Sequence, residues 1–222
     1  PTNRLLTTDV QGGVRDKLAD WIGCVPYIFT GASGDLGNRQ FRQGNDFAEL
    51  RRVSNGIARE IMKGAFEPIE LAAPKVSRFE HHVHYNNEDF YPQYQAQLDE
   101  VLEVLANNPT FDEKKLADTE KEMLEQQLQR HEMDFTVAMT TLDFGSVVFT
   151  TFPGELASEL GAIVKGAFDG TGKHPVIIGY ANDYQGYFVA AHTYGGSSYE
   201  SYVTQMPKGW TEQMLASYGE QL

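Results

Sequence analysis

Residues 146–178 have the sequence SVVFTTFPGELASELGAIVKGAFDGTGKHPVII. The apolar run at 146–152 predicts a strand, and apolar residues recur at helical spacing from Glu155 to Phe168. Val176-Ile177-Ile178 then predicts a second core strand. This order of strand, helix and strand predicts an α/β domain with a mixed β-sheet core and flanking helices.

Hydrophobic periodicity and turn residues predict the other elements outward from this stretch. They are a helix over 9–22 with Asp9 as its N-cap and Gly23 at its end, a buried strand over Val25–Phe29, a helix over 46–64, a strand over 75–85, a helical hairpin inserted at about 89–131, a strand over 133–142 joined to the strand at 146–152 by Asp143-Phe144-Gly145, and a short helix near 210–218.

Length and composition limit the class of protein. The chain has 222 residues, of which 41% are hydrophobic, so it can bury one substantial core and we expect a single domain over 1–222. Its 31 acidic and 18 basic residues give a formal net charge of -13, which repels nucleic acid and anionic membranes. The single Cys24 forms no internal disulfide, and no apolar run is long enough to span a bilayer.

Several polar side chains follow the predicted strands near the C-terminus. Glu155 follows a Phe-Pro-Gly turn, and tyrosines including Tyr184, Tyr187 and Tyr194 are dense in the segments after it. These residues suit the rim of an active site. Spacing alone leaves a structural interpretation open, in which Glu155 favours the dipole of the helix that it begins and the tyrosines pack with a polar tip.

Two other motifs suggest chemistry of different kinds. Thr30-Gly-Ala-Ser-Gly-Asp-Leu-Gly37 follows a predicted strand and has the glycine spacing of an NAD(P)-binding loop, but no apolar helix starts directly after it, as that motif requires. His82 and His84 lie on one face of a predicted strand, which can supply two imidazoles to zinc, although no third ligand is evident. Solvated histidines on an exposed strand are the alternative.

The combination of Pro153-Gly154-Glu155, Gly179-Tyr-Ala-Asn-Asp-Tyr-Gln-Gly-Tyr187, Tyr194 and Tyr199-Glu200 resembles the C-terminal part of the catalytic domain of the neutral/alkaline non-lysosomal ceramidase family. Asn3-Arg4-Leu5 and Gly34-Asp35 run in that family's order as well. The resemblance implies an amide hydrolase in which two histidines, a glutamate and a tyrosine hold one Zn²⁺. It assigns the glutamate to Glu155 and the tyrosine to Tyr194.

The departures from this family carry further expectations. The residues that match the two zinc histidines would precede Pro1, so we expect an N-terminal segment, or a second chain produced by proteolytic processing, to supply them and form a heteromer. Gly37 occupies the position of a family serine, which makes long-chain ceramide a doubtful substrate and leaves metal-activated water as the simpler nucleophile. Asp35 is a candidate base, with capping of local amides as its structural alternative.

The sequence therefore predicts a zinc-dependent hydrolase of an amide, or of an ester or lactone. Arg39, Tyr184 and Tyr187 are candidates for substrate contacts. The family resemblance suggests a secreted or periplasmic protein. A higher oligomer stays open, because the sequence does not determine the oligomeric state. A non-catalytic subunit that binds a ligand at the aromatic rim is the main alternative, and an NAD(P)-binding oxidoreductase is less favoured.

Overall fold

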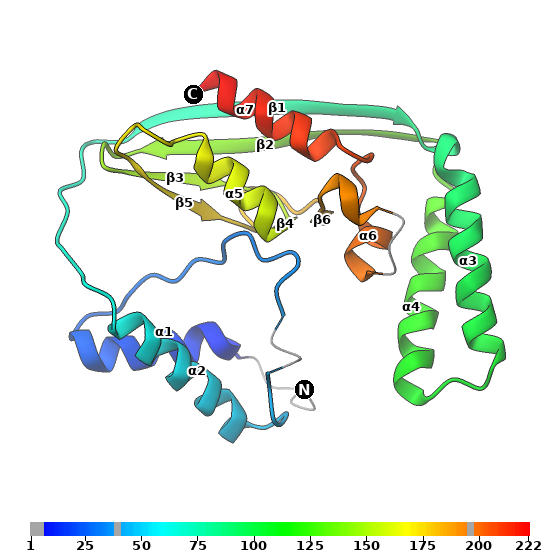
Figure 1. Ribbon diagram of the computed structural model, residues 1–222, viewed down its shortest axis with the longest axis horizontal. Helices are drawn as coiled ribbons and strands as arrows, with labels where there is room; N and C mark the ends of the chain where they lie inside the picture. Colours follow the sequence, from blue (N-terminus) through cyan, green and yellow to red (C-terminus); the bar gives the residue numbers. More distant parts are fainter. Residues whose placement is uncertain (1–6, 38–40, 195–197) are drawn as a thin grey trace.

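A computed structural model describes residues 7–37, 41–194 and 198–222 of the chain (Figure 1). The helices in these residues are α1 (Asp9–Ile22), α2 (Phe47–Met62), α3 (Tyr91–Ala106), α4 (Phe111–Gln127), α5 (Ser158–Gly166), α6 (Tyr199–Val203) and α7 (Trp210–Gln221), with two 3-10 turns, η1 (Asn87–Phe90) and η2 (Ala191–Thr193). The strands are β1 (Lys75–Asn86), β2 (Glu132–Asp143), β3 (Val147–Thr151), β4 (Glu155–Leu156), β5 (His174–Ile178) and β6 (Tyr187–Phe188).

The central sheet is mixed and has the strand order β1-β2-β3-β5. The β1–β2 and β2–β3 pairs are antiparallel, whereas β3 and β5 are parallel and are joined through α5. The turn between β2 and β3 is the predicted one, because Gly145 adopts a φ of 90° and its N–H donates to the Asp143 carboxylate over 2.8 Å. The predicted mixed α/β fold is confirmed.

Two layers of apolar side chains make the main core. Helices α5 and α7 pack together on the sheet, where Leu160 and Met214 meet Val83 and Val137 of the β1–β2 pair. The buried Tyr218 of α7 exchanges hydrogen bonds with the Thr141 and Thr150 hydroxyls over 2.8 and 2.9 Å. These bonds satisfy a phenol that burial would otherwise penalise.

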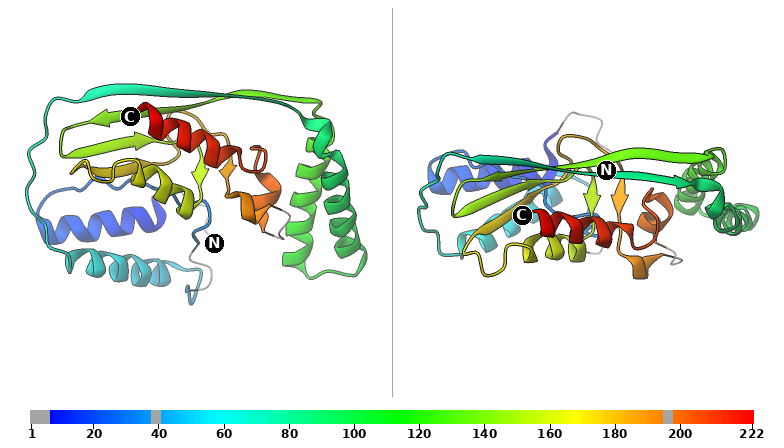
Figure 2. Two further views of the ribbon diagram at one scale, coloured as in Figure 1. Left: turned by 45° about the horizontal axis from the view of Figure 1, so that its top comes forward. Right: turned by 90° about the horizontal axis from the view of Figure 1, so that it is seen from above.

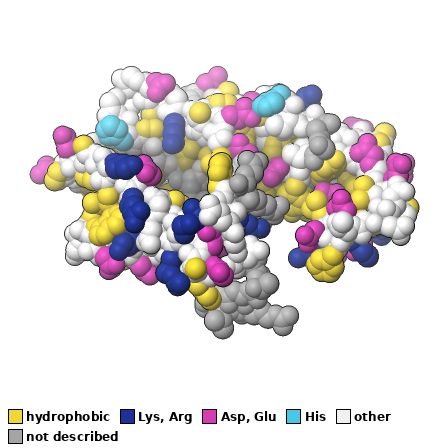
Figure 3. Space-filling view, turned by 60° about the horizontal axis from the view of Figure 1, so that its bottom comes forward, with side chains coloured by type: hydrophobic (Ala, Val, Ile, Leu, Met, Phe, Trp, Pro, Cys, Tyr) yellow, Lys and Arg dark blue, Asp and Glu magenta, His cyan; other side chains and the backbone are white. Residues whose placement is uncertain are grey.

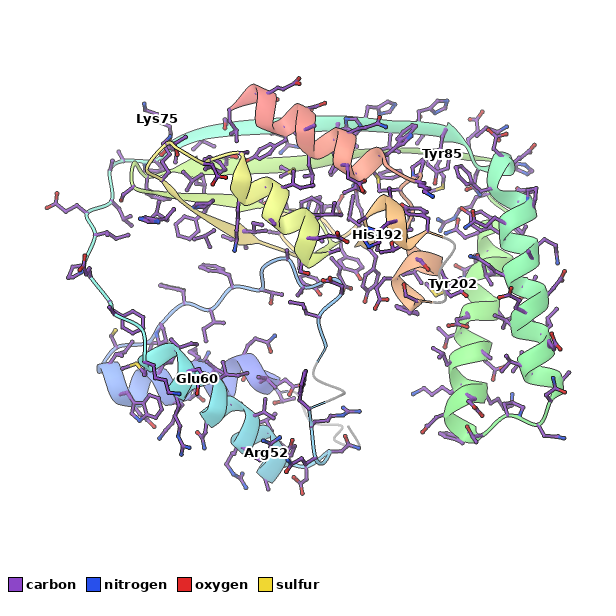
Figure 4. The ribbon with its side chains drawn as sticks, in the orientation of Figure 1. Arg52, Glu60, Lys75, Tyr85, His192 and Tyr202 are labelled. Atoms are coloured by element: carbon purple, nitrogen blue, oxygen red, sulfur yellow. The ribbon has the colours of Figure 1, made fainter. Side chains whose placement is uncertain are left out.

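The helical hairpin α3–α4 stands at the far end of the long β1–β2 ribbon, away from the main core (Figure 2). It has its own small core that includes Leu98 and Leu124. The buried amide of Asn87 fixes it to the ribbon by donating to the Gln127 and Arg130 carbonyls, each over 2.8 Å. Tyr85, at the same end of β1, donates to the Gln205 carbonyl over 2.6 Å (Figure 4). The two predicted helices of the hairpin are present as α3 and α4, and its status as an insertion stays a prediction.

Helices α1 and α2 form a separate pair beyond the β5 edge of the sheet (Figure 1). They pack on each other through Val14, Leu18 and Ala58. Lys and Arg side chains gather over this pair on an otherwise acidic molecule (Figure 3). No helix in the described residues is long and apolar enough to cross a membrane.

Three sequence predictions about local structure are wrong. Thr8, not Asp9, is the N-cap of α1, and Asp9 is its first residue. Val25–Phe29 is extended but is neither a strand nor buried, because it forms no ladder with a neighbour within the described residues. Glu155 does not begin a helix: the backbone of β6 supplies a parallel partner for Glu155 and Leu156, and α5 starts only at Ser158.

We predict that Gly154→Ala destabilises the fold. A Cβ at this position would lie 2.5 Å from the Gly186 carbonyl oxygen and 2.8 Å from the Phe188 ring. Overpacking of this kind costs about 1–3 kcal/mol of the free energy of unfolding, which urea denaturation followed by circular dichroism measures. Gly56→Ala is the matched control, since a Cβ there meets nothing within 4 Å in α2 and gains about 1 kcal/mol of helix propensity. Equal stability of the two variants would contradict the prediction.

Candidate metal and substrate site

Glu155 is held by main-chain bonds on both sides of its short strand. Its N–H donates to the Gly186 carbonyl over 2.8 Å, and the next residue, Leu156, accepts from the N–H of Gly34 over 2.8 Å. A Cβ at Gly34 would lie 2.5 Å from the Glu155 carbonyl oxygen, so only glycine permits this approach. The position of the Glu155 backbone is therefore fixed by two loops distant in sequence.

The loop that contains Gly34 also caps the N-terminus of α5. Both carboxylate oxygens of Asp35 accept hydrogen bonds from Ser158, one from its N–H and one from its hydroxyl, each over 2.7 Å. A carboxylate at this place satisfies a free amide and favours the dipole of α5. This contact gives Asp35 a structural role, and its part in catalysis stays a prediction.

The same loop does not have the geometry of a dinucleotide site. In the described residues after Gly37, the next helix is α2, which begins only at Phe47. A nucleotide loop needs a helix N-terminus directly after its glycines to hold the pyrophosphate. Gly34 instead lets the loop approach the backbone of β4.

The Glu155 carboxylate accepts hydrogen bonds from two phenols. Tyr180 donates to Oε2 over 2.8 Å and Tyr184 donates to Oε1 over 2.6 Å. The two rings are stacked, with centroids 6.0 Å apart. Tyr187 lies beside them and packs edge-on against Tyr199. The structure thus brings Glu155, Tyr184 and Tyr187 together at one rim, as the sequence predicts.

This rim is open to solvent, and its phenols are hydrogen-bond donors. Tyr180 is 45% exposed and Tyr184 is 56% exposed, while Glu155 is half-buried. Partial burial, reinforced by the hydrogen bond to Glu155, raises the pKa of Tyr180, of Tyr184 and of Tyr187. All three phenols therefore keep their protons at neutral pH, and a ligand or metal at Glu155 would meet them in that state.

Tyr180 is missing from the predicted site residues, although it contacts Glu155 directly. Its backbone has a φ of 55°, and that of Asn182 has a φ of 74°. This left-handed conformation is strained for a bulky side chain, by about 1–3 kcal/mol, and such strain gathers at functional sites. The Asn182 side chain donates to Thr151 over 2.9 Å and steadies the turn. The Asn-Asp pair after a core strand is the sequence signal that indicates this turn.

Tyr194 has no hydrogen bond to the Glu155 carboxylate within the described residues. Its phenol donates to the Met206 carbonyl, and burial raises the pKa of Tyr194 to about 12. No contact among the described residues joins Tyr194 to Glu155. Its role as a zinc ligand stays a prediction, as does substrate binding by Arg39, which lies outside the described residues.

The described residues contain no group of three or more His, Cys, Asp or Glu side chains placed to hold a metal ion. His82 and His84 share a face of β1, as predicted, with parallel rings 6.4 Å apart. Both point to the exposed Asp134 of β2, at 3.5 and 3.6 Å. Neither histidine has a hydrogen bond or an ion pair with Glu155 in the described residues.

The fold is similar to that of solved ceramidases. The chain matches the crystal structure of neutral ceramidase from Pseudomonas aeruginosa with a TM-score of 0.54 and 17% sequence identity, over 99% of this chain and 42% of that chain. It matches a ceramidase complexed with C2 with a TM-score of 0.54 and 16% identity, over 98% of this chain and 41% of that chain. No protein-family model and no curated protein sequence matches it.

These comparisons support the resemblance seen in the sequence at the level of the fold. The chain spans about 42% of the length of the ceramidase, so the fold seen here corresponds to one part of a larger chain. At this identity the comparison shows shared architecture and not shared chemistry.

We predict that Glu155→Gln lowers the pKa of Tyr184. The amide can still accept a hydrogen bond, but it removes the negative charge that favours the neutral phenol. Titration of ¹³Cζ-labelled tyrosines by NMR measures this change, with Tyr184→Phe to assign the signal. Tyr194 is the internal control, because its pKa depends on burial and on Glu212 and should not move. If the pKa of Tyr184 were the same in Glu155→Gln, the charge of Glu155 would not be what favours the neutral phenol of Tyr184.

Proposed function

We propose that this chain is part of a zinc-dependent hydrolase that cleaves an amide, or an ester or lactone. The observation that carries the proposal is the Glu155 carboxylate, fixed between two loops at an open rim of phenols. The ceramidase-like fold over nearly the whole chain supports it. Glu155 and Tyr194 are the proposed protein ligands from this chain.

The chemistry of these side chains fits zinc in part. A carboxylate and a phenolate are oxygen donors that suit Zn²⁺ when imidazoles complete the set. Zinc bound there would supply the Lewis acidity that activates water for hydrolysis. The phenol of Tyr194 would have to leave the Met206 carbonyl and lose its proton to take part, since its pKa is about 12 without metal.

The remaining residues of the rim have roles that do not depend on the metal. The phenols of Tyr180 and Tyr184 hold protons at their Oη atoms and donate them to Glu155, so either would have to turn away from this carboxylate to donate to a carbonyl oxygen of the substrate. Tyr187 and the exposed face of Tyr184 offer an apolar surface for its acyl or amine portion. In this proposal Asp35 is a positioning residue. It accepts two hydrogen bonds from Ser158 and so fixes the start of α5, which follows Glu155 in the chain.

The two imidazoles belong, in this proposal, to a partner segment outside the present sequence. The solved ceramidase is more than twice as long as the part that this chain matches, which leaves room for such a segment. The assembled protein would then be a heteromer or a single longer polypeptide.

A non-catalytic subunit that binds a ligand at the rim is the second candidate. It is favoured by one observation, namely that both Glu155 oxygens and the Tyr194 phenol already have hydrogen-bond partners within the chain. Zinc content, measured together with hydrolysis of short N-acyl amide probes by the assembled protein, separates the two candidates.

We predict that Glu155→Gln lowers zinc occupancy in the assembled protein. Loss even of a group that only supports a ligand weakens metal affinity by about 10–100-fold, so loss of a ligand should cost at least that much. Elemental analysis after dialysis against a weak chelator measures the occupancy. Tyr194→Phe should act in the same direction.

Tyr202→Phe is the control for this experiment, because Tyr202 projects from α6 beside Glu100 and Glu120 and lies outside the rim (Figure 4). Unchanged zinc content in Glu155→Gln would remove Glu155 from the proposed ligand set.

A further inference from the structure

The main chain of Val25–Phe29 is unpaired within the described part of the chain. It is extended, yet none of its backbone N–H or C=O groups has a hydrogen-bond partner within residues 7–37, 41–194 and 198–222. One bond just beyond it, from the N–H of Gly179 to the Thr30 carbonyl over 2.7 Å, aligns the segment with the end of β5. The segment therefore ends beside the edge strand β5, where Phe29 packs edge-on against Phe149 of β3, and it forms no ladder with β5 within the described residues.

The side chains of this segment are apolar on both faces. Val25 and Tyr27 are 71% and 90% exposed, and Ile28 and Phe29 are exposed as well. Apolar residues at successive positions are typical of strands buried on both sides within a sheet. Such a sequence at an open edge is a template for pairing with another strand.

Apolar surface continues on either side of the segment. Towards the sheet, Phe29, Ala32 and Ile177 line a hollow of about 520 Å³. Towards the helices, Val25 and Tyr27 form the apolar wall of another hollow of about 530 Å³, whose opposite wall at the N-terminal part of α1 includes the polar Gln11 and Arg15.

The α1–α2 pair adds to this surface. Trp21, Phe47 and Ile57 of these helices are exposed, and the pair packs mainly on itself. Apolar side chains are visible on this face of the molecule (Figure 3). These apolar side chains lie among the Lys and Arg side chains of the pair, so the surface beside Val25–Phe29 is partly apolar and partly basic.

We propose that Val25–Phe29 is the docking edge for the rest of the ceramidase-like domain, which adds an extended strand of alternating apolar residues to it. The identity of this partner rests on the proposed function, in which the same polypeptide brings the zinc imidazoles. Strand addition satisfies the free main-chain groups and buries the apolar side chains in one step.

Two observations favour this occupant. The similar ceramidase has more than half of its chain outside the part matched here, so a polypeptide of the required size exists in that architecture. A second copy of this chain is disfavoured, because two molecules with a net charge of -13 repel each other.

Hydrogen–deuterium exchange tests the proposal on this chain alone and on this chain produced together with the remaining part of the domain. We expect the amides of Tyr27, Ile28 and Phe29 to exchange as unprotected groups in the isolated chain. In the assembly their exchange should slow by at least about 100-fold, as for amides in a stable ladder. Unprotected amides in a fully formed assembly would overturn the proposal.

Ile28→Pro removes the amide at the centre of the edge and should weaken assembly at least about tenfold, measured by light scattering after size exclusion. Ile69→Pro is the matched control, because Ile69 is also exposed and its N–H makes no hydrogen bond within the described residues. Normal assembly of a folded Ile28→Pro variant would overturn the proposal. If that variant fails to fold, the exchange experiment decides.

Other outcomes separate this proposal from the zinc proposal. Protection of 25–29 that rises with the concentration of the isolated chain would replace the partner with a second copy and overturn the inference. An assembly that protects 25–29 but binds no zinc would uphold the docking edge and refute the zinc function. An assembly that binds zinc but leaves the amides of 25–29 unprotected would uphold the zinc function and refute the docking edge.

Discussion

The main chain from Phe152 to Ala157 is the constraint on which the rest of the structure depends. Its carbonyls and amides bond to three separate stretches: Gly34, residues 178–181 and residues 185–188. A buried backbone must find a partner for each polar group, so these stretches are drawn to one place. Gly154 and Gly34 make this possible. A Cβ at Gly154 would clash with the Gly186 carbonyl oxygen, and a Cβ at Gly34 would clash with the Glu155 carbonyl oxygen. The position of Glu155 follows from this pairing.

The same constraint explains why the candidate site consists of oxygen atoms. The turn from Tyr180 to Tyr187 is pinned to Phe152, Pro153 and Gly154 by main-chain bonds, and this places its phenols over the Glu155 carboxylate. The strained backbone at Tyr180 is tolerated because those bonds over-determine it. A rim built in this way can offer hard oxygen ligands and protonated donors.

The segment 25–29 and the α1–α2 pair both expose apolar side chains. Each is a surface that a folded domain normally buries, and each borders the β5 side of the sheet (Figure 1). The chain spans about 42% of the length of the ceramidase whose fold it shares.

The sequence by itself determined the elements whose signals are local. The strand at 75–85, the helical hairpin and the Asp143-Phe144-Gly145 turn could be predicted, because periodicity and turn residues act within a few positions. Glu155, Tyr184 and Tyr187 could be gathered into one rim since each follows a core strand.

Only the tertiary structure decided where Glu155, Tyr194 and Val25–Phe29 lie. Glu155 is a strand residue because β6 pairs with it, and Tyr194 turns to the Met206 carbonyl because burial requires a partner for its phenol. Val25–Phe29 has the composition of a buried strand but lacks a neighbour in the described chain. Pairing and burial depend on residues far apart in sequence, and local patterns do not contain that information.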